Sequence, residues 1–251
     1  MFIVVNADDL GTSEPINNET FALMESGLVT SSTIIANSPA FEPAMARTRD
    51  FPKCSFGVHL NLTVFPPLTG SRGLEAVLDE KGHLSPKLSQ ANISGALRDA
   101  LFGELSAQVQ RVLDAGVPVS HFDSHQHIHT IPALFPVLKQ LQRKFGIRRV
   151  RPTINLLPAS QRMTPMRWLK KAVYSTALQN WYATKSPEGL GDFRDFYAVL
   201  KSGSTPRFRT MELMVHPGTG SPRYSDEIDL LRSGWRQLLP AGVSFGSYHA
   251  I

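Results

Sequence analysis

The sequence has little cysteine, no long apolar run and few charged side chains, and each shortage excludes a class of protein. One cysteine, Cys54, excludes a disulfide framework within the chain and any zinc site built from several thiolates. No run of about 18 apolar residues is present, so no membrane span is predicted. Charged residues make up only 19% of the 251 residues and hydrophobic residues 42%, which argues against disorder and suffices for a sizeable core.

The N-terminal sequence, MFIVVNADDL, lacks the basic region, long apolar stretch and small-residue cleavage site of a secretory signal. Together with the single cysteine, this leads us to expect a cytoplasmic protein.

The net charge of +5 and the pI of about 9.5 raise the question of an anionic partner. The basic residues are spread out, however, and no zinc-finger or RNP signature accompanies them. We therefore read them as a solvated surface and expect neither a nucleic-acid nor a membrane partner. The densest basic group comprises Arg143, Lys144, Arg148, Arg149 and Arg151, with Arg167, Lys170 and Lys171 further along.

Apolar and β-branched runs alternate with stripes of helical spacing, which is the pattern of an α/β protein. We expect a helix between Pro15 and Gly27 and further helices over 97–112, 134–145, 166–179 and 228–238, whereas 181–206 is ambiguous. The expected strands are residues 2–6, 30–36, 55–62, 117–122, 148–151, 211–215 and 243–246. About seven strands interleaved with helices in one chain predict a (β/α) barrel, and an incomplete one; a doubly wound open sheet is the alternative.

The segment 64–92 is rich in proline, glycine and polar residues, and we expect a long excursion with little regular structure. Because it follows a strand that carries a histidine, we predict that it borders the functional site and that trimming it alters substrate preference more than stability. Phe65 and Leu68 could pack on a sugar or under the loop.

Four polar clusters follow directly after expected strands. They are Asn6-Ala7-Asp8-Asp9, His59-Leu60-Asn61, the histidine-rich stretch 121–129 and His216-Pro217-Gly218. The carboxyl ends of barrel strands carry the active site, so clusters far apart in sequence would converge there.

The residue types in these clusters suit a catalytic metal site. Each cluster alone has a purely structural interpretation. Asp8-Asp9 could form a helix-capping turn, and the histidines of 121–129 could lie in a polar loop. His59 could be a hydrogen-bonded core residue. Together, one carboxylate and two histidines from different strands would leave coordination positions for water and substrate. A second aspartate could then accept a proton and His216 donate one, which describes metal-assisted hydrolysis.

These same residues carry a family resemblance. NADDLG at 6–11, VTSSTIIAN at 29–37, GVHLNLT at 57–63, HFDSHQHIHTIP at 121–132 and ELMVHPG at 212–218 resemble the YdjC-like family, which includes carbohydrate deacetylases acting on chitooligosaccharides. The motifs stand in order along the chain, with YSDEIDLLRS and GVSFGSY near its end. The resemblance implies a single domain over residues 1–251, folded as a divergent, incomplete (β/α) barrel.

The resemblance also implies roles for individual residues. Asp9, His59 and His125 match the family's metal ligands, Asp8 its general base, and His216 its acid. Leu10 stands where the family usually has phenylalanine. Three further residues could orient a ligand histidine or contact substrate, and these are Asp123, His127 and His129.

The implied function is metal-dependent hydrolysis of N-acetyl groups from acetylated amino sugars, with release of acetate and action on a carbon–nitrogen bond other than a peptide bond. The family points to magnesium, whereas two histidines and a carboxylate also suit zinc. A homodimer is expected from the resemblance alone. Another barrel hydrolase, such as a phosphoesterase or amidohydrolase using the HxH pair His127-Ile128-His129, is the alternative, although no glycine-rich phosphate loop is present. A second alternative function is a non-catalytic sugar-binding protein.

Overall fold

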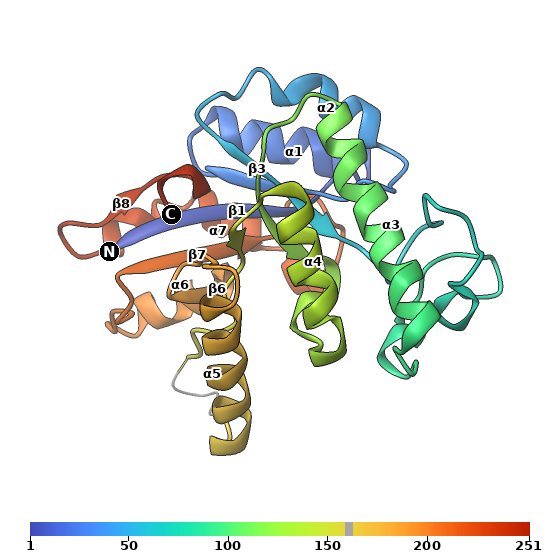
Figure 1. The fold of residues 1–251 in the computed structure, drawn as a ribbon. Helices are drawn as coiled ribbons and strands as arrows, with labels where there is room; N and C mark the ends of the chain where they lie inside the picture. The colour runs from blue at the N-terminus through green and yellow to red at the C-terminus, as the bar shows by residue number, and fades with distance from the viewer. Residues whose placement is uncertain (159–162) are drawn as a thin grey trace.

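The computed structural model describes residues 1–158 and 163–251, which fold around one parallel β-sheet with helices packed outside it (Figure 1). In Figure 1 α1 (Glu14–Glu25) and α2 (Phe41–Thr48) lie above β1 (Phe2–Leu10), and α6 (Phe193–Lys201) lies below it. The remaining helices are α3 (Gly95–Asp114), α4 (Phe135–Phe145), α5 (Pro165–Asn180) and α7 (Glu227–Arg232).

The sheet is a curled, incomplete barrel, as the sequence predicted. Its other strands are β2 (Ser31–Ile34), β3 (Ser55–Leu60), β4 (Val119–Ser124), β5 (Arg149–Val150), β6 (Gly189–Asp192), β7 (Thr210–Val215) and β8 (Ser244–Phe245). The order is β5-β4-β3-β2-β1-β7-β6, and β8 pairs with the start of β1. Within the described residues, no ladder joins β5 to β6. Arg149 of β5 bridges Lys185, and Asn155, beyond β5, bridges Leu190 of β6, so only isolated bridges span this gap and the barrel is incomplete there.

Local sequence signals set the bounds of α1. The Oγ of Ser13 accepts a hydrogen bond from the Ile16 amide at 3.4 Å, and Pro15 occupies the first turn, where no amide hydrogen is needed. Gly27 adopts a left-handed conformation with φ 69° after the helix ends. Pro15 and Gly27 are the residues from which the helix was predicted, and the structure adds the Ser13 cap.

The ambiguous stretch 181–206 contains a strand and a helix, β6 and α6. The sequence of β6, Gly-Leu-Gly-Asp, has none of the β-branched residues that predict a strand. Glycine is needed here because the side chains of Phe208 and Met211 pack closely: a Cβ on Gly189 would lie 2.8 Å from Phe208, and one on Gly191 would lie 2.6 Å from Met211. Only tertiary packing identifies this strand. No helix of the described residues is both long and apolar enough to cross a membrane.

The segment 64–92 begins beyond the carboxyl end of β3 and folds into two short 3₁₀ turns. Leu74, Val77, Leu84 and Leu88 are buried and join the main core. Glu104 on α3 accepts hydrogen bonds from both the amide and the hydroxyl of Thr69, at 2.9 and 2.8 Å. This buried anchorage argues against the prediction that trimming the segment would alter substrate preference more than stability.

Candidate metal centre and active site

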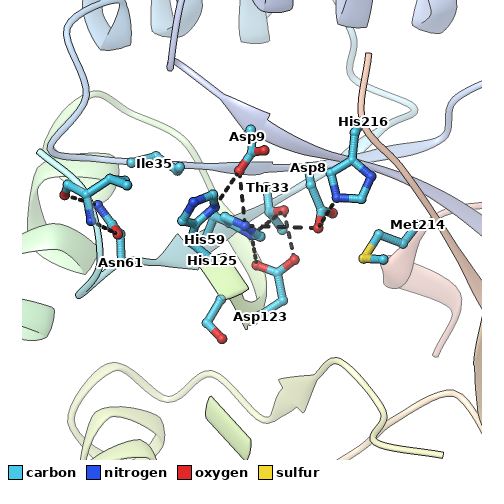
Figure 2. A network of polar contacts seen from close by, with 12 residues as sticks. Asp8, Asp9, Thr33, Ile35, His59, Asn61, Asp123, His125, Met214 and His216 are labelled. Atoms are coloured by element: carbon cyan, nitrogen blue, oxygen red, sulfur yellow. Dashed lines mark hydrogen bonds and ion pairs between the residues drawn. The ribbon is translucent and has the colours of Figure 1, made fainter. Parts of the chain in front are cut away.

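Asp8 and Asp9 both reach the same side of the sheet, although neighbours in a strand normally point to opposite faces. The register of β1 against β2 shifts between Ala7 and Leu10, and Asp9 has a positive φ of 68°. A bulge of this kind re-aims a side chain. Gly11 follows with φ 96°, where a Cβ would lie 2.9 Å from Ser38 Oγ. The bulge therefore places both carboxylates at the carboxyl end of β1, as Figure 2 shows.

Asp9, His59 and His125 meet at this edge from three different strands or strand ends. The Oδ1 of Asp9 lies 2.9 Å from His125 Nδ1 and 3.3 Å from His59 Nε2. The candidate ligand atoms of the three residues all lie within 4.8 Å of one another. Although burial raises the pKa of Asp9, the two imidazoles hold it well below its usual value. An anionic oxygen and two imidazole nitrogens converging on one point form a donor set that fits a divalent cation.

His59 is oriented by Asp123, as the sequence suggested for one of the ligand histidines. Asp123 Oδ1 lies 2.8 Å from His59 Nδ1, and Asp123 Oδ2 accepts the Thr33 hydroxyl at 2.8 Å. This contact fixes the ring so that Nε2 faces Asp9, the arrangement in which a carboxylate supports a metal-binding histidine. Burial lowers the pKa of His59, but Asp123 and Asp8 outweigh it and raise the pKa to about 10.

Asp8 is held by Arg151, a residue that the sequence analysis assigned to a solvated basic surface. That assignment is wrong, because the Arg151 side chain is completely buried. Its Nη1 donates to Asp8 Oδ2 at 2.8 Å and its Nη2 to Asp8 Oδ1, so the contact is bidentate. Burial raises the pKa of Asp8, but the Arg151 guanidinium more than reverses this and keeps the carboxylate ionised.

Arg151 also connects the site to the far end of the chain. Its Nε donates to Glu212 Oε1 at 2.9 Å, and Asp123 Oδ2 lies 2.8 Å from its Nη2. The Tyr248 hydroxyl donates to the other oxygen of Glu212. Three carboxylates thus share one buried cation, which offsets much of the cost of burying them. The arginine at the end of the expected strand RRVR was a usable signal, since it stands where the other site residues stand.

His216 extends from the end of β7 toward the same carboxylates. Its Nε2 lies 4.0 Å from Asp8 Oδ2, and its ring stacks on Tyr224 with centroids 4.0 Å apart. Its backbone amide donates to Glu227, a buried carboxyl on α7. Burial lowers the pKa of His216, and Asp8 only partly opposes this. The base and acid candidates therefore lie side by side in the site (Figure 2).

The histidines of 121–129 go to different places. His121 stacks on Tyr248 at 3.6 Å, away from the candidate ligands, and His129 is buried with its Nδ1 against the Ser124 hydroxyl. Gln126 and His127 both have positive φ, so the chain turns sharply after His125. His127 lines the cleft, and burial lowers its pKa to about 4.

A cleft of about 390 Å³ opens over Asp8, Asp9, His59, His125 and His216. Its described outer walls come from segment 124–127 and from segment 219–224, which contributes Arg223 and Tyr224. Residues 64–92 are not among those walls, so the prediction that this segment borders the cleft is not met. The segment follows the strand that carries His59 but packs sideways on α3 instead.

Comparison with known proteins places the chain in a family. The model of the YdjC-like protein family matches residues 2–237. The chain belongs to the YdjC-like family. This confirms the resemblance on which the roles of the site residues were based.

Curated relatives of this YdjC-like chain include two bacterial proteins named carbohydrate deacetylase. One, from Geobacillus stearothermophilus, is 35% identical over 157 residues, covering 62% of each chain. Another, from Listeria monocytogenes, is 36% identical over 154 residues, covering 59% of each. The matched part of the chain thus spans about three-fifths of the length of these relatives.

Solved structures share the fold. A proposed cellobiose-phosphate cleavage protein from Enterococcus faecalis superposes with a TM-score of 0.77 at 21% identity, covering 99% of this chain and 98% of the other. A family 4 acetyl xylan esterase from Clostridium thermocellum, solved with a cobalt ion, superposes with a TM-score of 0.50 at 10% identity, covering 100% and 89%. At these identities the likeness concerns the fold alone.

Proposed function

We propose that this YdjC-like chain is a metal-dependent carbohydrate deacetylase that hydrolyses N-acetyl groups on amino sugars and releases acetate. The observation that carries the proposal is the convergence of Asp9, His59 and His125 beside a base candidate, Asp8, and an acid candidate, His216, in one cleft. The names of the curated relatives support the same reaction class.

Asp9, His59 and His125 would hold the cation. A divalent cation there would supply Lewis acidity to the acetyl carbonyl and favour ionisation of a nearby water. Magnesium is proposed first because of the family resemblance, with zinc as the alternative because of the two imidazole donors. Asp123 keeps His59 aimed at this position through the 2.8 Å contact with Nδ1.

Asp8 and His216 would manage the protons. Asp8, ionised beside Arg151, accepts a proton from the attacking water, and His216 donates one to the departing amine nitrogen. The lowered pKa of His216 makes its protonated form a stronger acid toward that amine. The proton on Asp8 would then return to His216 through a water molecule, since the two groups lie 4.0 Å apart, beyond direct hydrogen-bond reach.

Acetate release tests the proposal. The purified chain is assayed on N-acetylglucosamine oligomers and related acetylated sugars, with and without chelator, and magnesium or zinc is then added back. We expect acetate release that chelator abolishes and one of the two metals restores. Phosphate release from sugar phosphates without acetate release would instead favour a phosphoesterase, and saccharide binding without turnover a binding protein. The cytoplasmic location and the homodimer stay predictions from the sequence.

A further inference from the structure

Helix α5 exposes an unusual amount of apolar surface. In the described part of the chain, five of the six large hydrophobic side chains that stand exposed lie on α5 or directly after it. We call these five residues the α5 patch: Met166 (62% exposed), Trp168 (57%), Leu169 (50%), Val173 (61%) and Trp181 (56%). Residues 164–170 are all exposed, and Figure 1 shows α5 extending away from the sheet. Apolar surface gathered in this way marks an interaction site.

The helix is firmly attached along its other side, so the exposure is not the result of a loose segment. Leu178 is buried, the Tyr174 hydroxyl donates to the His129 carbonyl, and Lys171 Nζ donates to the Thr153 carbonyl at 2.9 Å. At the carboxyl end of the helix, the buried Lys139 ammonium donates to the carbonyls of Leu178 and Trp181 at 2.7 and 2.8 Å. These contacts hold the patch outward.

The stretch of sequence that contains the α5 patch carries charge of one sign. No aspartate or glutamate occurs between Asp123 and Glu188, although this stretch holds 11 of the 26 lysines and arginines. The rest of the chain holds the other 15 basic residues together with all 21 acidic ones. On the helix itself, Arg167 and Lys170 are exposed beside the apolar residues. The basic residues of the acid-free stretch are Lys139, Arg143, Lys144, Arg148, Arg149, Arg151, Arg162, Arg167, Lys170, Lys171 and Lys185.

We propose that the α5 patch is a docking surface for an anionic lipid bilayer, with Trp168, Leu169 and Met166 entering the headgroup region and Arg167 and Lys170 pairing with lipid phosphates. A projecting helix that combines tryptophan, aliphatic side chains and exposed cations has the composition of an interfacial membrane helix. The surface thus binds a membrane without spanning it. This departs from the expectation of no membrane partner, which rested on the absence of an apolar span.

Two other occupants fit the α5 patch less well. A second copy of the chain docked patch to patch would bring Arg167 and Lys170 near the same two cations of its partner, and like charges at an interface repel. A nucleic acid would match the charge but would leave Met166, Leu169 and Val173 against a polar backbone. An anionic bilayer satisfies both the charge and the apolar side chains.

Vesicle binding tests the proposal. The full chain is mixed with vesicles of phosphatidylcholine alone or of phosphatidylcholine with phosphatidylglycerol, and the bound fraction and tryptophan emission are measured. Trp168 and Trp181 are exposed while Trp235 is buried, so a blue shift on binding reports the patch. We expect binding and a blue shift with the phosphatidylglycerol vesicles only, weakening as salt is added.

Substitutions localise the effect. Arg167→Gln and Lys170→Gln should each weaken binding roughly fivefold, since a cation near an anionic surface contributes about 1 kcal/mol, and Leu169→Ser with Trp168→Ser should abolish the blue shift. Leu238→Ser and Lys201→Gln, exposed residues elsewhere, are the matched controls and should change neither. Equal binding by all variants, or no binding to either vesicle, overturns the proposal. A dimer in sedimentation that Leu169→Ser dissociates, without vesicle binding, assigns the patch to self-association instead.

Discussion

At the scale of single residues, Asp8 has two roles: it is the candidate general base, and it pairs with the buried Arg151. Asp8→Asn removes the proton acceptor but keeps the size and a carbonyl oxygen for Arg151. We expect kcat for acetate release to fall by about 10²–10⁴-fold, with the metal still bound. The variant should also unfold at a lower temperature, because Arg151 loses a charged partner.

The matched control for Asp8→Asn is Asp99→Asn on the exposed side of α3, which should change neither kcat nor stability. Full activity in Asp8→Asn, or loss of the metal while the fold is kept, would contradict the role of base.

Substitutions of His125 and His129 test which histidine of the cluster is a metal ligand and which is structural. His125 contacts Asp9, whereas His129 is buried and held by Ser124. His125→Ala should lower metal affinity measured by calorimetry by at least about tenfold, while His129→Ala should keep metal affinity and lose stability. If His129→Ala loses the metal and His125→Ala keeps it, the wrong histidine of the cluster has been assigned.

At the scale of elements, the segment between β3 and α3 acts as part of the core. Leu84 is buried among Leu74, Val77 and Leu88 and its amide donates to the Phe65 carbonyl at 2.9 Å. Leu84→Ala should therefore cost about 2–5 kcal/mol of unfolding free energy, measured by denaturant titration, while the folded protein keeps its substrate preference. Glu80→Ala, exposed in the same segment, should be neutral. A Leu84→Ala variant of unchanged stability but altered preference would restore the original prediction for this segment.

Stability of the whole molecule should depend on pH through Glu227. Burial raises the pKa of this carboxyl to about 8, although the His216 amide opposes the shift. Between the ordinary value of 4.5 and about 8, the folded state holds a proton that the unfolded state lacks, so stability falls as pH rises through this window. The slope for one proton is about 1.4 kcal/mol per pH unit.

Glu227→Gln should remove that slope and leave the protein more stable than wild type near pH 8, as denaturant titrations between about pH 5 and pH 8 would show. Asp229→Asn on the exposed side of α7 is the control and should keep the wild-type slope. An unchanged slope in Glu227→Gln would mean that another group governs the pH dependence.

The sequence by itself determined the features that depend on near neighbours. Pro15 and Gly27 predicted the limits of α1, and apolar runs predicted most strands, because helix termination and strand periodicity are local properties. The polar clusters after those strands indicated which side chains would converge, and the structure brings Asp8, Asp9, His59, His125 and His216 to one cleft.

Only the tertiary structure decided which polar groups are buried together and which apolar groups are left outside. Arg151 reads as one more surface cation until the barrel places it between Asp8, Asp123 and Glu212, from segments distant in sequence. β6 reads as a glycine-rich loop until Phe208 and Met211 pack over it. Leu169 and Val173 lie in a helix that the sequence predicted, but only the structure shows that they are exposed on a helix projecting from the sheet. Burial is set by contacts across the whole chain, which periodicity along one segment does not encode.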